Sequence, residues 1–310
     1  MRRVGSDMGI LRLSHVEVRV PDLELATAYY TEVVGMYETA RQPDRVFLKC
    51  WDEHQHHSVI LRFEATYGLV HMGWKVQFRE DLDFYADRLA KVGVEVTRFA
   101  HGEIGPGHGE AIRFTMPSGH LMELVYGMEQ VGNLLPLTNP PPKPLNLVGF
   151  APPRLDHIFI TCEDVGANTR FLQEVLEFHL TEQVLGDDGF QVATWLEHSH
   201  AAHDIALVTG QDRGLHHFAY WVDDWTAIRD VADVLAYHGV HIEKNPTRHG
   251  ATRGHCLYFF DPAGNRNEVF TGGYYVDPEE PPITWTEAEM GRAIFYYDGV
   301  VNQNFLTVHS

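Results

Sequence analysis

The sequence predicts an α+β protein of two domains, each built from two strand–helix–strand–strand–strand modules. Two internal matches are the main evidence. Residues 14–36 match 156–178, since each stretch reads as a strand, an acidic turn and a helix with apolar residues at helical spacing. Residues 71–94 match 217–240 in the same way. Each half of the chain therefore carries two copies of one unit of about 50 to 60 residues, and such repetition is a direct fold signal.

A proline-rich segment, Gly132 to Pro153, separates the two halves. Because proline disrupts helix interiors and central strands, we expect a linker over 132–153. This places an N-terminal domain without a catalytic site at 1–131 and a catalytic domain at 154–272. In each domain, two modules side by side form one open, curved mixed sheet, a half-barrel with helices outside. The inside of such a curve is a natural pocket.

Residues 273–310 form an extra C-terminal segment. Within it, the stretch "TWTEAEMGRAIFYY" (284–297) opens with Thr284, a candidate N-cap, and continues with residues compatible with a helix. We expect this helix to cover the mouth of the pocket in the C-terminal domain.

Composition and charge narrow the classes of function. The 310 residues include 24 basic and 43 acidic side chains, for a net charge of −19. This balance disfavours nucleic acid and anionic membranes as partners, since both select basic faces. We find no run of apolar residues long enough to span a membrane and no signal peptide. Three scattered cysteines favour free thiols in a reducing cytoplasm.

A candidate metal centre lies in the C-terminal half. His157 and His217 begin equivalent strands of successive modules, and Glu268 lies in the last strand. If the inward faces of these strands line the pocket, the three side chains converge. Two imidazoles and one carboxylate are the ligand set of non-haem Fe(II) oxygen chemistry, and Mn(II) suits the same set. His216 is the alternative to His217, which we favour because it precedes a four-residue apolar run, as His157 does.

The stretch "TRHGATRGHCLYFFDPAGNRNE" (247–268) resembles the signature of type I extradiol ring-cleavage dioxygenases. "GRAIFYYDG" and "NFLTV" resemble the catechol 2,3-dioxygenase branch, so the resemblance extends over most of the chain. It implies a vicinal-oxygen-chelate fold with Fe(II) held by His157, His217 and Glu268. The implied activity is extradiol cleavage of catechol or short-alkyl catechols by O2 to 2-hydroxymuconate semialdehydes, in aromatic degradation. The resemblance also implies a homotetramer.

The resemblance assigns further roles residue by residue. It implies that His203 stabilises negative charge on the reacting oxygen and then gives a proton. Tyr258 is implied to orient a substrate oxygen, and His249 to do the same or to take the substrate proton. The ring of the substrate is implied to face three residues: Trp195, Ile294 and Phe305. Ala251 is small and, if it lines the pocket, leaves room for a substituent, which favours a monocyclic catechol.

Three alternatives stay open at this point. The substrate can be a bicyclic diol such as 2,3-dihydroxybiphenyl. The same fold also serves metal-dependent lyases, isomerases and thiol transferases, which need a metal but no O2. A non-catalytic binding protein on this fold usually lacks the metal triad.

The strands around Glu268 predict a hairpin, because "HCLYFF" is a run of strand formers and "DPAG" is a turn signal in which Asp261 bonds to the backbone. If the loop is the five residues "DPAGN", Tyr258 lies directly opposite Glu268. A four-residue loop places Leu257 there instead. We predict the longer loop, since the implied chemistry requires Tyr258 and Glu268 on one face.

The N-terminal half repeats the residue types of the candidate site. Superposition of the halves aligns these residues with the metal set and with His203, in order: His15, His71, Glu123 and His57. Arg113, however, stands where Tyr258 stands in the other half. A permanent cation there opposes a metal ion and can pair with Glu123. We therefore expect an Arg113–Glu123 pair at a relic of duplication.

Overall fold

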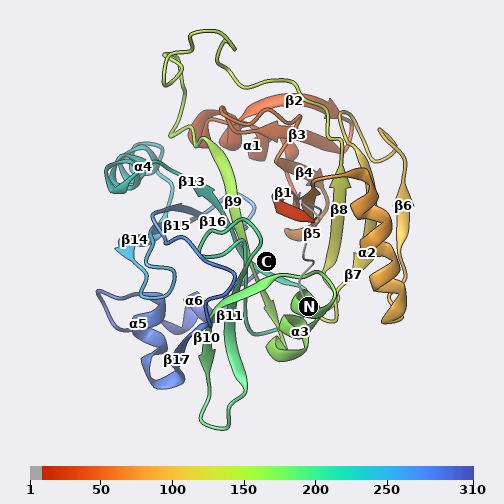
Figure 1. The fold of residues 1–310 in the computed structure, drawn as a ribbon. Helices are drawn as coiled ribbons and strands as arrows, with labels where there is room; N and C mark the ends of the chain where they lie inside the picture. Colours follow the sequence, from red (N-terminus) through yellow and green to blue (C-terminus); the bar gives the residue numbers. More distant parts are fainter. Residues whose placement is uncertain (1–8) are drawn as a thin grey trace.

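The computed structural model describes residues 9–310 and contains two mixed sheets, one in each half of the chain (Figure 1). The first sheet has eight strands in the order β2-β3-β4-β1-β5-β8-β7-β6. The second has nine strands in the order β14-β15-β16-β13-β9-β12-β11-β10-β17. Both sheets are open, so the predicted fold of paired half-barrels is confirmed.

The N-terminal half contains two successive modules, and each runs as a strand, a helical segment and three strands. The elements of the first are β1 (Ile10–Val20), α1 (Leu23–Ala28), the π-helical η1 (Tyr29–Val34), β2 (Tyr37–Gln42), β3 (Arg45–Lys49) and β4 (Val59–Phe63). The elements of the second are β5 (Gly68–Val76), α2 (Arg79–Lys91), β6 (Thr97–Phe99), β7 (Glu110–Thr115) and β8 (Leu121–Tyr126).

The C-terminal half repeats this order. Its first module comprises β9 (Arg154–Cys162), α3 (Val165–Glu174), β10 (His179–Leu185), β11 (Gln191–Glu197) and β12 (Ile205–Thr209). Its second module comprises β13 (Gly214–Trp221), α4 (Trp225–Tyr237), β14 (Ile242–Arg248), β15 (His255–Phe260) and β16 (Arg266–Thr271). In each half the first strands of the two modules pair antiparallel at the centre of the sheet.

The acidic turns of the sequence start helices. Three helices begin with an aspartate whose side chain accepts a hydrogen bond from the backbone N–H three residues later: Asp22, Asp164 and Asp224. Each such cap satisfies one of the free N–H groups at a helix start and contributes about 1 kcal/mol to stability. These caps explain why a helix directly follows β1, β9 and β13, whereas α2 begins after Phe78 without a side-chain cap.

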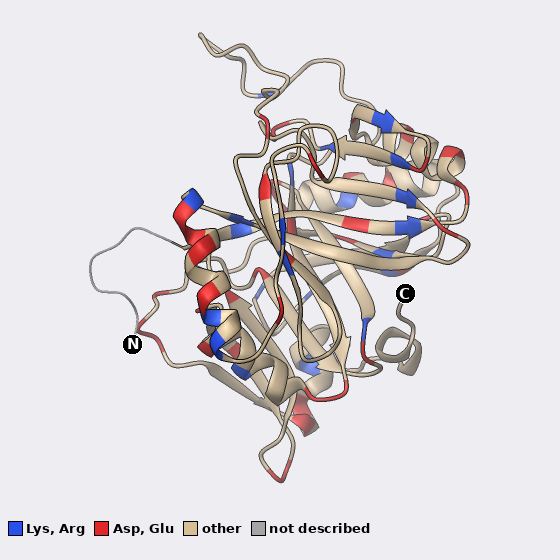
Figure 2. Cartoon of the chain, turned by 90° about the vertical axis from the view of Figure 1, so that its right-hand side faces the viewer, with Lys and Arg blue, Asp and Glu red and all other residues tan. Residues whose placement is uncertain are grey.

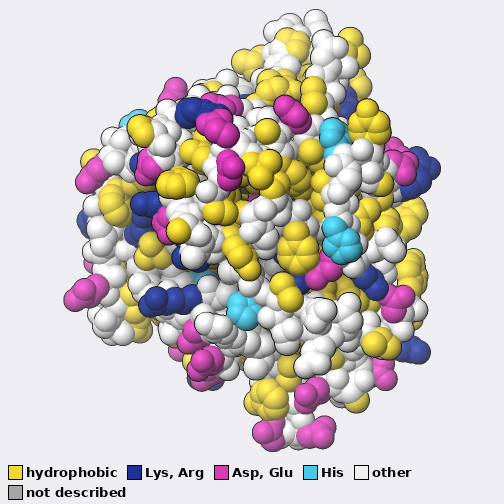
Figure 3. Space-filling model, turned by 180° about the vertical axis from the view of Figure 1, so that it is seen from behind, with side chains coloured by type: hydrophobic (Ala, Val, Ile, Leu, Met, Phe, Trp, Pro, Cys, Tyr) yellow, Lys and Arg dark blue, Asp and Glu magenta, His cyan; other side chains and the backbone are white. Residues whose placement is uncertain are grey.

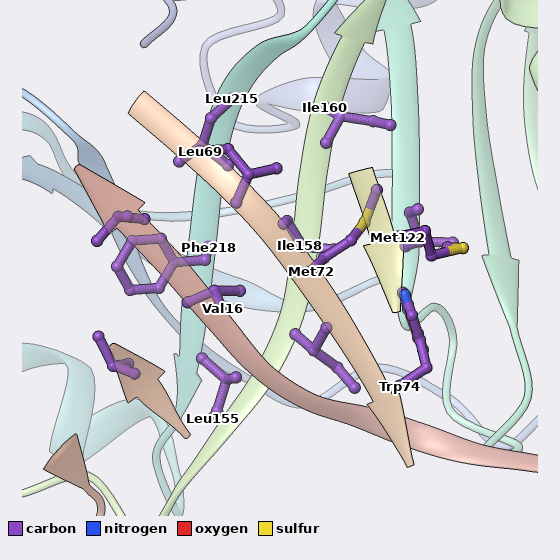
Figure 4. Close-up of a cluster of buried hydrophobic side chains, with 14 of the residues drawn as sticks. Val16, Leu69, Met72, Trp74, Met122, Leu155, Ile158, Ile160, Leu215 and Phe218 are labelled. Atoms are coloured by element: carbon purple, nitrogen blue, oxygen red, sulfur yellow. The ribbon is translucent and has the colours of Figure 1, made fainter. Parts of the chain in front are cut away.

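The main core joins the two halves. Val16, Met72 and Trp74 of the N-terminal half lie beside Ile158 and Ile160 of β9 (Figure 4). Because side chains alternate along a strand, the residues between these isoleucines point the other way. Packing of one face of β9 against the N-terminal half thus turns His157 and Phe159 toward a separate apolar cluster in the C-terminal half.

The segment from Gly132 to Pro153 contains no helix or strand and forms the long loop between the two sheets (Figure 1). Leu137 and Leu145 in it are 90% and 94% exposed. The observed loop agrees with the proline-rich composition of this stretch, since prolines remove the donors that a sheet or helix requires.

The C-terminal segment differs from the expected single helix. Ile283–Thr286 is a strand, β17, which pairs in parallel with β10 at the edge of the sheet. A 3-10 turn, η2 (Glu287–Glu289), precedes α5 (Met290–Ile294), and α6 (Gln303–Thr307) follows. The expected helix from Thr284 to 297 was therefore wrong at both ends. The open edge of β10 and a hydrogen bond from Trp285 Nε1 to the buried Glu182 favour the strand instead.

Acidic and basic residues are interspersed on the side of the molecule that Figure 2 shows. That side has no basic face. This agrees with the net charge of −19. In residues 9–310, no helix combines the length and the apolar character needed to cross a membrane.

Candidate metal centre

Three adjacent strands of the second sheet bring two imidazoles and one carboxylate together. His157 lies on β9, His217 on β13 and Glu268 on β16, which are neighbours in the sheet. The Nε2 atoms of His157 and His217 lie 3.1 and 2.8 Å from the same oxygen, Glu268 Oε2. All three side chains are at most 2% exposed. Their donor atoms, two nitrogens and one oxygen, suit Fe(II) or Mn(II).

His217, and not His216, points into this cluster. His216 is buried and its pKa is held well below the ordinary value by burial, so the ring is neutral. Its Nε2–H donates to the carbonyl of Phe305, 2.8 Å away, which leaves its Nδ1 as an acceptor for His217 Nδ1–H at 2.6 Å. The lone pair of His217 Nε2 therefore faces Glu268. A neighbour that holds the tautomer of a ligand in this way is typical of metal sites.

The charges of the cluster are coupled. Burial opposes ionisation of Glu268, but His217, His157 and His249 hold the pKa of this carboxylate well below its ordinary value. Burial also opposes protonation of His157, yet hydrogen bonds to Asp156 and Glu268 raise its pKa to about 9. Burial prevails at His217 and lowers its pKa to about 4, against the pull of Glu268. The hydrogen bond to Asp156, which His217 lacks, accounts for the higher pKa of His157. Metal binding must displace the proton of His157.

A pocket opens beside this cluster. The structure places every residue of the predicted site on this one pocket: His157, His217, Glu268, His203, His249, Tyr258, Trp195, Ala251, Ile294 and Phe305. A larger and more open cleft lies around Arg19, Arg213 and Ser310, but it lacks a cluster of metal-binding groups among the described residues. We therefore assign the chemistry to the smaller pocket.

His203 packs against the metal cluster, with its ring tilted by 48° from that of His157. Its ring centroid lies 4.0 Å from that of His157, and its Nδ1 is buried without a hydrogen-bond partner among the described residues. Burial, together with the nearby His157, holds the pKa of His203 well below its ordinary value. A neutral imidazole with an unused nitrogen thus lines the pocket. Several other histidines are buried as well, and the histidines visible on the face in Figure 3 are scattered.

His249 and Tyr258 form a second polar wall. The Tyr258 hydroxyl lies 3.1 Å from His249 Nε2, which is also 3.3 Å from Glu268 Oε1. His249 Nδ1–H donates to the carbonyl of Ile294 in α5. Burial opposes a charge on His249, but Cys256 and Glu268 raise its pKa well above the ordinary value. The C-terminal segment therefore fixes the orientation of a side chain in the pocket.

The β15–β16 hairpin has the predicted five-residue loop. Phe260 pairs with Arg266, and Tyr258 pairs with Glu268. Asp261 stabilises the turn, because its Oδ1 accepts hydrogen bonds from the backbone N–H groups of the three residues Ala263, Gly264 and Asn265. This confirms the prediction on loop length and the turn role of Asp261.

Two residues near the centre were missed in the sequence. Asp156 Oδ2 lies 3.0 Å from His157 Nδ1, where it orients the ring. Cys256 is buried, and its sulfur lies within 4.8 Å of ligand atoms of His249 and Glu268. Both could have been recognised in the sequence. Asp156 directly precedes a candidate ligand, and Cys256 shares a strand face with Tyr258.

The N-terminal half holds the expected ion pair. Arg113 Nη2 lies 2.7 Å from Glu123 Oε2, and these residues are cross-strand partners like Tyr258 and Glu268. His15 and His71 lie beside Glu123. The pairing of Arg113 with Glu123 is thus confirmed.

Comparisons with known families agree with the fold and the pocket. Residues 154–269 match the family described as the glyoxalase/bleomycin resistance protein/dioxygenase superfamily. Residues 69–128 match the family described as the catechol 2,3-dioxygenase-like N-terminal domain.

Relatives extend the match to nearly the whole chain. A metapyrocatechase of Pseudomonas sp. (strain CF600) is 40% identical over 97% of this chain and 98% of its own length. A manganese-dependent 2,3-dihydroxybiphenyl 1,2-dioxygenase of Geobacillus genomosp. 3 is 33% identical over 93% of this chain and 94% of its own. Among solved structures, the 2,3-dioxygenase LapB from Pseudomonas sp. KL28 superposes with a TM-score of 0.87 at 38% identity, covering 91% of this chain and 99% of that one.

Proposed function

The chain belongs to the extradiol ring-cleaving dioxygenases and is a catechol 2,3-dioxygenase-like enzyme, and on this premise we propose its substrate, its metal and the roles of its residues. The proposed substrate is catechol or a catechol with a short alkyl substituent. Cleavage of the ring bond next to the diol with one O2 puts both oxygen atoms into a 2-hydroxymuconate semialdehyde. No other reductant is needed, because the ring itself is oxidised.

His157, His217 and Glu268 are the proposed metal ligands, and Fe(II) is the proposed metal. The fit rests on three buried donor atoms that meet at one point, with the outer nitrogens of both imidazoles held by Asp156 and His216. Held by these residues, such an ion would supply open coordination positions for the diol and for O2. Mn(II) suits the same donors, and one relative is described as manganese-dependent.

His203 is the proposed acid–base group. It stands beside His157 as a neutral imidazole with a free nitrogen, so its N–H can stabilise negative charge on the reacting oxygen. The same proton can then be delivered as the O–O bond breaks. Burial keeps competing water away from this nitrogen.

Tyr258 and His249 are proposed to orient the substrate. Their mutual hydrogen bond places a hydroxyl and an imidazole on the wall that also carries Glu268. Substrate oxygens bound near Glu268 then come within reach of both groups. The carbonyl of Ile294 keeps the His249 ring in place.

The pocket favours a single aromatic ring. Trp195, Ile294 and Phe305 provide its apolar lining. Ala251 is 2% exposed and lines the same pocket, so its small side chain leaves space for a methyl or ethyl substituent. A bicyclic diol is the second candidate, since one relative is described as acting on 2,3-dihydroxybiphenyl.

The proposal extends to assembly and compartment. The family resemblance favours a homotetramer, which sedimentation velocity tests directly. Cys50, Cys162 and Cys256 are all free and buried, which suits a reducing cytoplasm.

The observation that carries the proposed function is the convergence of His157, His217 and Glu268 on one pocket. The test is oxygen uptake by anaerobically purified protein, loaded with Fe(II) or Mn(II), with catechol, 3-methylcatechol and 2,3-dihydroxybiphenyl. We expect a yellow ring-fission product from the first two and the higher rate with Fe(II). Turnover of the biphenyl diol alone would contradict the substrate proposal, and turnover without O2 would contradict the reaction class.

A further inference from the structure

We propose that the N-terminal half contains a second, structural metal site, suited to a divalent ion of the zinc class and formed by His15, His71, His108 and Glu123. This site is separate from the proposed catalytic centre and lies in the first sheet, on β1, β5, β8 and the loop before β7. His108 did not emerge from the superposition of the two halves. The structure brings it to Glu123 from a loop without a regular element.

The ligand atoms have the spacing of a coordination shell. His15 Nε2 lies 2.9 Å from His71 Nε2 and 3.4 Å from Glu123 Oε1. His108 Nε2 lies 2.9 Å from the same Oε1. Ligands at about 2.1 Å from an ion are separated by roughly 3.0 Å in octahedral and 3.4 Å in tetrahedral geometry. One ligand atom each of His15, His71 and Glu123 lies within 4.8 Å of the other two, a spacing that could hold one ion. His108 reaches this group through Oε1 of Glu123.

His108 brings a further nitrogen to this carboxylate. Its Nδ1 lies 3.1 Å from the carbonyl oxygen of Gly109, and its Nε2 lies 2.9 Å from Glu123 Oε1. Both Nε2 and Oε1 are buried and have no other hydrogen-bond partner among the described residues. A metal ion beside them would bind donor atoms that are otherwise unused.

The group behind His71 resembles the partner of a metal-binding histidine. His71 Nδ1 lies 2.8 Å from the buried carboxylate of Glu17, which leaves Nε2 of His71 as the ligand atom. Imidazole ligands of metals usually donate their other N–H to such a carboxylate. Asp156 holds His157 in the same way in the C-terminal half.

Gly73 makes room for the cluster. A Cβ atom at this position would lie 2.1 Å from Cε1 of the His15 ring. Any larger residue would therefore push the imidazole away from His71 and Glu123. The backbone of β5 thus accommodates the ring where the donor atoms meet.

Arg113 hydrogen-bonds to only one of the two carboxylate oxygens of Glu123. Its two hydrogen bonds to this carboxylate, from Nε at 3.1 Å and from Nη2 at 2.7 Å, both go to Oε2, and Nη2 also lies 3.5 Å from His71 Nε2. The other oxygen, Oε1, faces His15 and His108. The ion pair and the metal site therefore use different oxygens of one carboxylate. Arg113 also occupies the place of Tyr258, so the site lacks the substrate-orienting hydroxyl of the catalytic half.

The site is closed, which favours a structural role. The side chains of His15, His71, His108 and Glu123 are 0% exposed. Structural zinc sites are saturated by protein ligands, whereas catalytic sites keep one position for substrate or water. An ion here would connect β1, β5 and β8 with the loop that carries His108.

The test uses full-length protein in which the proposed catalytic centre is disabled by His217→Ala and Glu268→Gln. After removal of metals with a chelator, this protein is incubated with Zn(II) or Co(II), and bound metal is measured by plasma emission spectrometry and by cobalt d–d absorption. We expect about one ion per chain. Adding His71→Phe should remove nearly all of it, and His108→Asn should weaken binding at least about tenfold, as expected for loss of one ligand group.

The exposed His101→Phe is the matched control and should leave the metal content unchanged. Circular dichroism checks that each variant is folded, and His108→Asn decides the matter if His71→Phe is not. Absence of bound metal in the disabled protein overturns the proposal. So does metal binding that neither His71→Phe nor His108→Asn reduces. The result is independent of catalysis, since oxygen uptake is not the readout.

Discussion

Tyr258 and Glu268 are directly opposed across the β15–β16 hairpin, so a phenolic hydroxyl and a buried carboxylate share one face of the sheet. The same hydroxyl lies 3.1 Å from His249 Nε2. One hairpin therefore supplies an anionic group for a metal and a hydrogen-bonding group for an oxygen of the substrate. Substitution of each residue separates these two contributions.

Tyr258→Phe should lower kcat/KM for catechol by about tenfold, the effect expected from loss of one hydrogen bond of ~1.4 kcal/mol in the transition state. The metal content should stay unchanged, because the side chain is not a proposed ligand. Steady-state oxygen uptake and metal analysis of the same preparation check both points. An unchanged kcat/KM would remove Tyr258 from the proposed machinery.

His203→Asn should lower kcat by about 100-fold or more, because positioned acid–base groups contribute on this scale. Asparagine keeps a polar side chain of similar size beside His157, so metal binding should persist. His200→Asn, at an exposed position three residues earlier, is the control and should retain full activity. If both variants had the same kcat as the parent protein, His203 would be only a packing residue.

Ala251→Leu should narrow the pocket and change the preference among substrates. We expect the ratio of kcat/KM for 3-methylcatechol to that for catechol to fall by about tenfold, the scale on which a pocket discriminates one methyl group. Parallel assays of the two catechols measure this ratio. A ratio equal to that of the parent protein would show that the substituent lies elsewhere.

His120 should make the protein less stable in acid. Burial lowers its pKa to about 4, although the carbonyl of Gly214 opposes this shift by accepting a hydrogen bond from Nε2–H. The unfolded chain takes up the proton near pH 6.5, whereas the folded chain does not. Stability is therefore complete above about pH 6.5 and falls as the pH drops toward 4, with a loss of about 2 kcal/mol at pH 5.

Urea unfolding at pH 7 and pH 5 of the parent protein and of His120→Gln measures this effect. The difference between the two proteins cancels the contributions of the other buried histidines. We expect the variant to lose about 2 kcal/mol less than the parent between these pH values. An equal loss in both proteins would assign the acid sensitivity to other groups.

Local sequence patterns predicted much of the fold. Internal matches gave the four modules, and the aspartates Asp22, Asp164 and Asp224 marked the helix starts. The loop length of the β15–β16 hairpin followed from the requirement that Tyr258 and Glu268 share a face. These features depend on short-range periodicity and turn chemistry, which a single sequence displays.

Long-range contacts were not predictable in this way. Residues 283–286 form a strand because the edge of β10 is available and Glu182 binds Trp285, a contact between positions about 100 residues apart. The place of His108 beside Glu123 likewise depends on the path of a loop. His157, His217 and Glu268 were predicted from their places on equivalent strands, whereas most other residues of the candidate site followed from the family resemblance, because several of them lie on loops and short helices.

The most direct test of the account is catechol-dependent oxygen uptake by Fe(II)-loaded Glu268→Gln protein, measured beside the parent protein under the same conditions. The glutamine keeps the shape of the side chain but removes the negative charge that His157 and His217 surround. We predict that the parent consumes one O2 per catechol and forms a yellow product, while the variant binds little iron and shows no uptake above background. Full uptake in the variant, or none in the parent, would contradict the central claim.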